Sequence, residues 1–249
     1  MDSVVFVFDG SFDGLLCAVF ASYAQKVIPV DLVTQNRVQL GFEQKFVEIL
    51  TDQSNARRVE VGFRKAAGNP AATTAWTAFL SGEPDAPLRV FRYLRAGFTL
   101  KHSLSHSLTH PDVLPVNQME RNIGREAQHM RGFTRFSAME NGVYYARITP
   151  KNNLLPILMP HFSDRFSVQP FLVFDPGHRL AGVYDRKEWY LVETADITLP
   201  ALSPEEPHYR SLWKKFYHTI AIEERRNPTL RRTMCPKRFW ANMYEMQGE

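Results

Sequence analysis

The period of the hydrophobic pattern changes near residue 132, and this change constrains the fold more than any other feature of the chain. Before it, apolar residues recur every three to four positions, as they do on the buried face of an α-helix. After it, short extended runs alternate with turn residues, as they do in β-sheets. The pattern therefore predicts an α+β protein with a helix-rich N-terminal half.

The N-terminal half begins with one strand. Val4 to Phe8 is a continuous run of β-branched and aromatic residues, which indicates a buried strand, and Asp9-Gly10 ends it with a turn. Ser11 or Asp13 is placed to cap a following helix. Residues 27–38 are mixed, with room for one short strand. Five further segments have helical periodicity: Phe42–Leu50, Ser54–Ala67, Ala71–Leu80, Leu88–Phe98 and Val116–Met130.

The pattern of the second half predicts a sheet followed by a helical tail. Phe133–Ala138 and Val143–Thr149 flank an Asn-Gly turn, which is the signature of a β-hairpin. Two helical segments follow, at Leu154–Phe162 and Tyr209–Glu224, and between them lie three strand-like runs: Phe171–Phe174, Leu180–Tyr184 and Trp189–Val192. This order predicts an antiparallel sheet with helices packed on one face.

Length and cysteine content limit the organisation. With 249 residues, 44% of them hydrophobic, the chain suffices for one large domain or two modest ones. We expect a single domain over residues 1–249 with three parts: 1–131, a strand plus helices; 132–198, the antiparallel sheet; and 199–249, a basic helical tail. Cys17 and Cys235 lie at opposite ends, so we expect no disulfide framework, no metal site and no cofactor.

The chain is expected to be cytoplasmic. Met1-Asp2-Ser3 lacks the basic region that opens a secretory signal. No apolar run approaches the roughly 20 residues that a membrane-spanning helix needs. We therefore expect no membrane association.

A dense polar cluster occupies the stretch from Pro160 to Pro170. His161 and Asp164 are one helical turn apart, and a carboxylate beside an imidazole is how proteins build a general base. Arg165 could hold a phosphate in a bidentate manner. These three are the candidate catalytic residues. The alternative is structural: Asp164 and Arg165 cap the helix and link it to the sheet, amid tightly packed phenylalanines.

The C-terminal tail is the strongest electrostatic feature. Between residues 214 and 238 it carries eight cations against only Glu223 and Glu224, and aromatic residues such as Trp213 and Trp240 are interleaved with them. Cations neutralise phosphates and aromatic faces stack unpaired bases, so the mixture suits single-stranded or distorted DNA. The alternative is an amphipathic helix whose charges are simply solvated. The candidate nucleic-acid-binding residues here are Lys214, Lys215, Arg225, Arg226, Arg231, Arg232, Lys237, Arg238 and Trp240.

Three further groups admit a functional interpretation. Arg125 and Arg131 are candidate phosphate ligands on the helix that also bears Glu126, although surface ion pairs are the commoner outcome for such residues. Asp9 and Asp13 lie at a strand end where carboxylates can hold magnesium, but a turn and a helix start explain them equally. Three histidines recur every four residues, a spacing that metal sites use, yet their surroundings favour solvated surface: His102, His106 and His110.

A series of motifs occurs in a fixed order over nearly the whole chain: Phe8–Phe20, Ala78–Pro84, Gly124–Phe136, Tyr144–Ala146, Pro160–Phe166, Asn227-Pro228 and Met234–Trp240. With this series the chain resembles a bacterial family of unknown function whose members are usually labelled DNA metabolism proteins.

The resemblance implies a role in DNA repair or modification. Members look like companions of a radical SAM protein, and some are fused to a uracil-DNA glycosylase domain. It transfers no catalytic residue, and two distant cysteines cannot bind an iron–sulfur cluster in this chain. The leading hypothesis is a DNA-binding accessory protein that partners the radical SAM protein. The alternatives are an enzyme acting on a DNA base or phosphodiester through His161 and Asp164, and a protein–protein adaptor without nucleic-acid contact.

Overall fold

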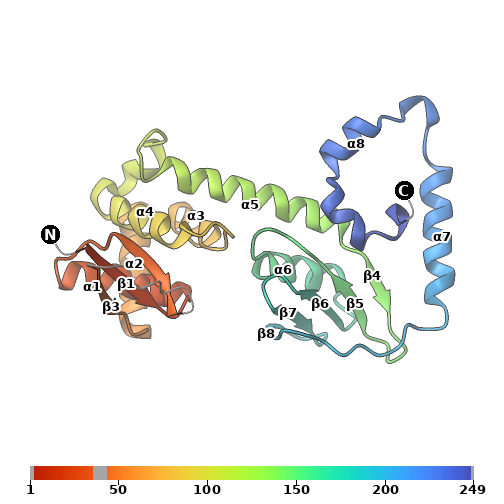
Figure 1. Ribbon diagram of the computed structural model, residues 1–249, viewed down its shortest axis with the longest axis horizontal. Coiled ribbons are helices and arrows are strands. Elements are labelled where there is room, and N and C mark those ends of the chain that lie inside the picture. Colours follow the sequence, from red (N-terminus) through yellow and green to blue (C-terminus); the bar gives the residue numbers. More distant parts are fainter. Residues whose placement is uncertain (1–2, 36–43, 248–249) are drawn as a thin grey trace. The chain divides into compact units, whose positions relative to one another are not determined.

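The computed structural model describes residues 3–35 and 44–247. The chain divides into two compact units, Met1–Ile123 and Gly124–Glu249 (Figure 1). The division falls inside one long helix, α5 (Leu114–Phe133), so the sheet and the tail that were expected as separate parts belong to one unit. The single domain over residues 1–249 stays a prediction. The mixed helix and sheet content confirms the α+β class.

The first unit is built on a three-stranded parallel sheet. The central strand β1 (Ser3–Phe8) pairs with β2 (Asp31–Thr34) on one side and β3 (Gln44–Glu48) on the other. Its residues Phe6 and Phe8 are buried because they enter the core on which the helices pack. The turn after β1 is held by Asp9, whose carboxylate accepts hydrogen bonds from Ser11 and from the Thr51 hydroxyl.

Among the residues that the structure describes, five helical elements described in full precede α5 in the first unit, to which the N-terminal part of α5 also belongs. The apolar periodicity predicts all five but the last. The Ser11 hydroxyl caps α1 by accepting from the amide of Gly14 at 2.9 Å, as its position predicts. The elements are α1 (Phe12–Ala24), α2 (Gln53–Ala67), α3 (Asn69–Phe79), α4 (Ala86–Leu100) and the 3-10 helix η2 (Lys101–His106).

The prediction of a helix over Phe42–Leu50 is wrong. Gln44–Glu48 is a strand, and Phe42 itself lies outside the described residues. The apolar residues Phe46 and Val47 are too few to distinguish the two periods, and pairing with β1 decides the outcome. The short strand expected within residues 27–38 is confirmed as β2. The last residues of that predicted range, up to Val38, lie outside the described residues.

The second unit contains a five-stranded sheet in the order β4-β5-β6-β7-β8. The hairpin of β4 and β5 around Asn141-Gly142 is confirmed, as are the three later strands. The bounds are β4 (Phe136–Ala138), β5 (Tyr144–Arg147), β6 (Phe171–Asp175), β7 (Leu180–Tyr184) and β8 (Trp189–Glu193).

The prediction of an antiparallel sheet needs correction, because the sheet is mixed. β5 and β6 are parallel, with Ala146 opposite Val173. The helix between them, α6 (Leu155–Arg165), carries the chain back to the end where β5 began, so β6 must run in the same direction. α6 packs on β7 and β8, and any β-carbon at Gly182 would overlap the Met159 side chain.

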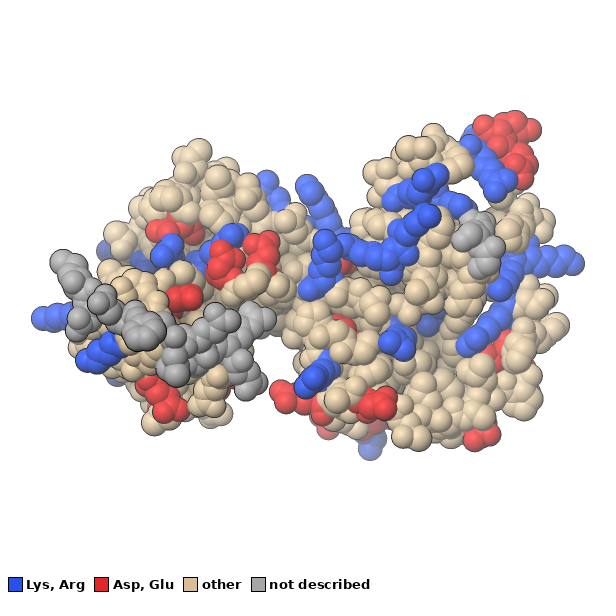
Figure 2. Space-filling model, viewed as in Figure 1, with Lys and Arg blue, Asp and Glu red and all other residues tan. Residues whose placement is uncertain are grey.

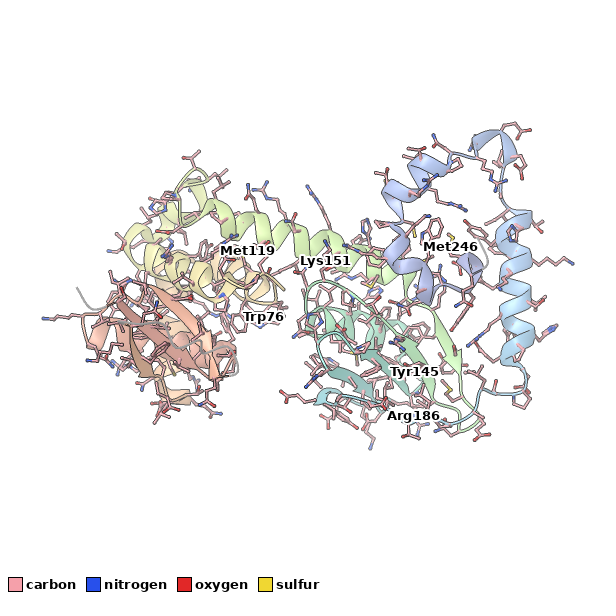
Figure 3. The ribbon with its side chains drawn as sticks, in the orientation of Figure 1. Trp76, Met119, Tyr145, Lys151, Arg186 and Met246 are labelled. Carbon is pink, nitrogen blue, oxygen red and sulfur yellow. The ribbon has the colours of Figure 1, made fainter. Side chains whose placement is uncertain are left out.

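The C-terminal tail is helical but interrupted. α7 (Glu206–Thr219) confirms the helix predicted from Tyr209, and the helix ends five residues before Glu224. A short helix, α8 (Pro228–Met234), was not predicted, although Asn227 caps it and Pro228 opens it. Near the C-terminus, Met243 and Met246 are buried, and Figure 3 labels Met246. Three 3-10 turns complete the described part of the tail. They are η3 (Glu223–Arg225), η4 (Lys237–Asn242) and η5 (Tyr244–Met246).

Candidate functional site

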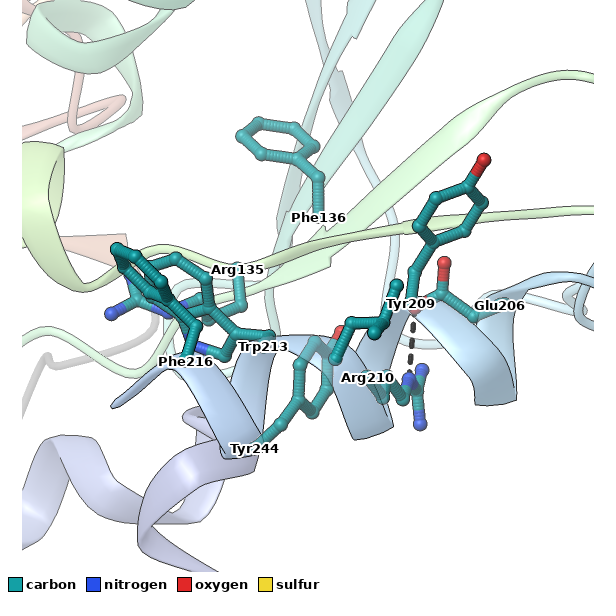
Figure 4. A pocket seen from close by; sticks show the side chains of 9 residues that line it. Arg135, Phe136, Glu206, Tyr209, Arg210, Trp213, Phe216 and Tyr244 are labelled. Atoms are coloured by element: carbon teal, nitrogen blue, oxygen red, sulfur yellow. Dashed lines mark hydrogen bonds and ion pairs between the residues drawn. The ribbon is translucent and has the colours of Figure 1, made fainter. Parts of the chain in front are cut away.

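A cavity of about 530 Å³ lies in the second unit, between α7, β4 and the C-terminal turns (Figure 4). α7 contributes one face to it, because Tyr209, Leu212, Trp213 and Phe216 follow the three- and four-residue spacing of a single helix face. All four side chains remain exposed, which is unusual for so continuous an apolar stripe. Phe136 and Tyr244 add two more rings to the lining. We call this cavity the α7 pocket.

Arg135 forms one wall of the α7 pocket. Its Nη2 donates to Glu245 Oε1 at 2.5 Å, and its guanidinium lies 5.3 Å from the centre of the Trp213 ring. The Glu245 side chain is 1% exposed. Burial raises the pKa of Glu245, but the hydrogen bonds and charge of Arg135 outweigh it and the net pKa is lowered. The pair is therefore ionised and fixed in place.

Arg210 forms the opposite wall in the same manner. Its Nε donates to Glu206 Oε1 at 2.8 Å, its Nη2 donates to the Ser137 hydroxyl at 2.7 Å, and its guanidinium lies 4.1 Å over the Tyr244 ring. The other oxygen of Glu206 accepts from the amide of Ala138 at 2.9 Å. The Ser137 and Tyr244 hydroxyls are hydrogen-bonded to each other. Two buried carboxylates thus neutralise the two guanidinium groups of the pocket.

A second cavity of about 290 Å³ shares Arg135, Arg210 and Tyr244 with the α7 pocket. It extends to Tyr145 and Arg147 on β5. Burial raises the pKa of Tyr145, with the charge of Arg147 acting in the opposite direction. The two cavities together place aromatic rings and cations along the C-terminal segment.

The predicted catalytic residues lie on the last turns of α6. His161 is half-buried, whereas Asp164 and Arg165 are exposed. Burial lowers the pKa of His161, and the charges of Arg131 and Arg165 lower it further against the opposing effect of Asp164. Within residues 3–35 and 44–247, no hydrogen bond joins His161 to Asp164. The imidazole is therefore a neutral group near two cations, and its catalytic role stays a prediction.

Part of the predicted nucleic-acid-binding set gathers around Trp240. The Arg231 guanidinium lies 5.1 Å and the Lys237 ammonium 5.7 Å from the centre of its ring. The indole Nε1 donates to the Cys235 carbonyl at 2.8 Å, which fixes the ring. Lys and Arg side chains lie over α8 and the adjoining turns on the face in view (Figure 2). The structure thus brings three predicted residues into one cation–aromatic cluster.

The other predicted cations lie on separate elements. Arg232, on α8, and Lys215, on α7, are exposed, and Lys214 is half-buried. Arg225 ends η3 and Arg226 follows it, with the Arg226 guanidinium 3.9 Å from the Glu223 carboxylate. Among the residues that the structure describes, these form no cluster as close as the one around Trp240.

Glu126 serves structure rather than a ligand. It is 4% exposed, and its oxygens accept from the backbone amides of Lys151 and Asn152 at 3.0 and 3.1 Å. Arg238, a predicted DNA ligand, donates to Glu126 at 3.1 Å. Arg125 and Arg131 on the same helix are exposed, with Arg131 3.4 Å from Gln128. One cation of the set is thus used in an internal ion pair.

A histidine–aspartate pair that sequence reasoning missed lies at the end of β6. His178 Nδ1 is 2.7 Å from Asp175 Oδ2, and the Asp175 side chain is fully buried. The bond to Asp175 raises the pKa of His178; burial opposes this shift, and Glu126 and the Lys151 carbonyl add to it. The bond to Asp175 ties the imidazole to the end of β6, which is a structural reason for the pair. The three-residue spacing after a strand was the available signal.

Only some residues of the α7 pocket could be predicted from the sequence. Its aromatic residues Trp213, Phe216 and Tyr244 stand out in the tail, but Arg135 and Glu245 are 110 residues apart. No local sequence pattern predicts an ion pair between residues so far apart.

The described residues contain neither a metal-ligand cluster nor a helix suited to span a membrane. Within residues 3–35 and 44–247, no three His, Cys, Asp or Glu side chains are placed to hold a metal ion. His102 and His106 lie on the exposed 3-10 helix η2 rather than on an α-helix, and His110 follows it in a turn. None of the described helices combines the length and apolarity that crossing a bilayer requires.

A family model matches the larger part of the chain. Residues 84–245 match the model of a family described as a domain of unknown function, DUF4130. No curated protein matches the chain.

Proposed function

The chain belongs to the DUF4130 family, a domain of unknown function, and from that premise we propose a DNA-binding accessory protein of DNA repair or modification. The DNA is single-stranded or distorted, so that its bases are open to aromatic side chains. The protein acts in the cytoplasm, where bacterial DNA lies.

The observation that carries the proposal is the concentration of charge in the tail. Residues 214–238 hold eight cations against two carboxylates, a net charge of +6, whereas the whole chain carries only +4. Within the described part of the chain, Lys215, Arg225, Arg232 and Lys237 are exposed and form no ion pair. Charges left open in this way are available to phosphates, whose release of counterions drives DNA binding.

Aromatic groups support DNA over other polyanions. Trp240 stands beside Arg231 and Lys237, and Trp213 stands beside Lys214 and Lys215. A polyphosphate or an acidic peptide would use the charges alone, while unpaired bases would use the rings as well.

The proposed partner is a radical SAM protein. Its support is the resemblance of the quoted motifs to a family whose members look like companions of such a protein. In this arrangement the chain holds the DNA and the partner supplies the radical chemistry, for which this chain has no thiolate cluster of its own.

The affinity for single-stranded DNA as a function of salt tests the proposal. We expect fluorescence anisotropy with a labelled oligonucleotide to give an affinity that falls steeply with salt. The double variant Lys215→Glu/Arg232→Glu should bind more weakly on every sequence, with a salt slope smaller by about 1–2.

The matched control is Arg57→Glu/Lys65→Glu, which reverses two exposed charges on α2 of the first unit. This control should bind as the wild type does. Absence of binding by the wild type would contradict the proposal and favour an adaptor that does not touch DNA. Binding without salt dependence, or equal losses in both double variants, would contradict the assignment of the tail as the DNA-binding surface.

A further inference from the structure

The α7 pocket combines features that suit one planar, uncharged ring. We propose that it takes a single unpaired DNA base, while the sugar–phosphate backbone stays outside along α7. This inference rests on the proposed function, since it specifies what part of the DNA enters which site.

The charges of the α7 pocket exclude a phosphate as its occupant. Its two guanidinium groups, on Arg135 and Arg210, are already paired with Glu245 and Glu206 at 2.5 and 2.8 Å. A phosphate placed between them would meet the two carboxylates as well as the arginines. A neutral ring meets no such opposition, and the planar faces of both guanidinium groups suit stacking.

The lining of the α7 pocket fits an aromatic ligand. The Trp213 and Phe216 rings lie 5.7 Å apart with an interplanar angle of 32°, so they offer adjacent faces. Trp213 is 39% exposed, Phe216 52% and Tyr209 62%, although all three are large and apolar. At about 530 Å³ the cavity is within the range of roughly 300–1,000 Å³ that small-molecule sites occupy.

Polar groups for the edge of a base are present. Arg210 uses its Nε and Nη2 within the protein, and its Nη1 forms no hydrogen bond within residues 3–35 and 44–247. The exposed Tyr209 also lines the pocket and carries a phenolic hydroxyl. These donors can meet the carbonyl or ring-nitrogen acceptors that an unpaired base presents.

Cations lie on the elements that bound the pocket. Lys214 and Lys215 follow Trp213 on α7, on other faces of the helix than the one that lines the pocket, and Arg147 lines the adjoining cavity of about 290 Å³. Neutral rings inside and positive charge outside are the complement of a nucleotide, which is apolar and flat at the base and negative at the phosphate. An apolar helix of a protein partner would use the rings but not this charge.

The test compares two DNA duplexes that differ in one residue. One carries a single bulged thymine, and the other carries an abasic residue at the same place. We expect the wild type to prefer the thymine duplex by roughly 5- to 150-fold, the range for one stacked base. Trp213→Ala should abolish this preference while leaving the affinity for the abasic duplex unchanged, and Trp213→Phe should keep much of it.

The matched control is Trp189→Ala on β8, which removes a tryptophan of similar exposure, 36%, outside the pocket. This control should retain the preference. Equal wild-type affinity for the two duplexes would overturn the inference while leaving the proposed function standing, and so would an equal loss on both duplexes in Trp213→Ala. Absence of DNA binding by the wild type would remove both. If Trp213→Ala fails to fold, the wild-type comparison and Trp213→Phe still decide.

Discussion

Aromatic residues at helical spacing occur both at the end of α6, as Phe162 and the capping Phe166, and along α7, yet the rings at α6 are packed together while those of α7 are exposed. Phe162 on α6 is 2% exposed, and its ring centre lies 5.2 Å from that of Phe136. Phe216 on α7 is 52% exposed. The difference arises from what faces each helix: α6 crosses over a sheet, whereas α7 faces a cavity lined by ion pairs.

The comparison teaches that aromatic content alone does not separate packing from function. The stretch from Pro160 to Pro170 attracted a catalytic interpretation because its polar groups are dense among phenylalanines. In the structure those phenylalanines pack edge to face with Phe136 and Phe171, which is a sufficient reason for their presence. The rings of α7 have no comparable explanation.

The largest expected effect is the difference in stability between a variant that lacks one ring at α6 and a variant that lacks one ring on α7. Phe162→Ala should lower the free energy of unfolding by about 3–5 kcal/mol, because it opens a cavity in the core. Phe216→Ala should change it by less than about 1 kcal/mol, because the ring is half exposed already. Urea unfolding followed by circular dichroism measures both. Similar losses in the two variants would mean that α7 is packed as α6 is.

A smaller effect is expected from the ion pair that supports the α7 pocket. Arg135→Ala leaves the buried carboxylate of Glu245 without its partner, which should cost about 2–3 kcal/mol of unfolding free energy. Adding Glu245→Gln removes the stranded charge and should recover part of the loss. Arg147→Ala, an exposed arginine in the adjoining cavity, serves as the control and should cost under about 0.5 kcal/mol. No recovery in the double variant would argue against the charge explanation.

The smallest effect is a dependence on pH that belongs to the sheet rather than to the pocket. The pKa of His178 is raised by Asp175 above its ordinary value of 6.5. A raised pKa in the folded state means that the stabilisation is complete below the unfolded pKa and is lost as pH rises through the folded pKa.

The variant His178→Gln should therefore be less stable than the wild type at about pH 5.5, and the gap should narrow as the pH rises. Thermal unfolding of both proteins from about pH 5.5 upward measures this difference in stability. A gap that widens toward high pH would show that His178 is held in its neutral form.

Much of the fold follows from the sequence, because periods sustained over ten residues or more leave little choice. α2 and α3 begin and end within a few residues of their predicted bounds, and the Asn141-Gly142 hairpin is where the turn residues place it. Alternation of apolar and polar residues identifies a strand but not its direction, so the parallel pairing of β5 and β6 could not be predicted. The five residues of β3 were too few to reveal their period.

The site was less predictable than the fold, for a physical reason. One arginine of the α7 pocket, Arg135, is paired with a carboxylate 110 residues away in the sequence, that of Glu245. Charge and aromatic content in the tail were visible, but which cations are neutralised depends on tertiary contacts. Arg238 illustrates this, since it belongs to the predicted DNA-binding set and is paired with Glu126.

The last strand of the five-stranded sheet has a practical consequence for handling the protein. All five side chains of β8 are exposed, including Trp189, Tyr190, Leu191 and Val192, and β8 ends the order of strands among the described residues. Its outer amides and carbonyls can pair with an extended segment of another molecule. Concentrated samples should thus self-associate through this edge, and replacing Leu191 with lysine should keep them monodisperse.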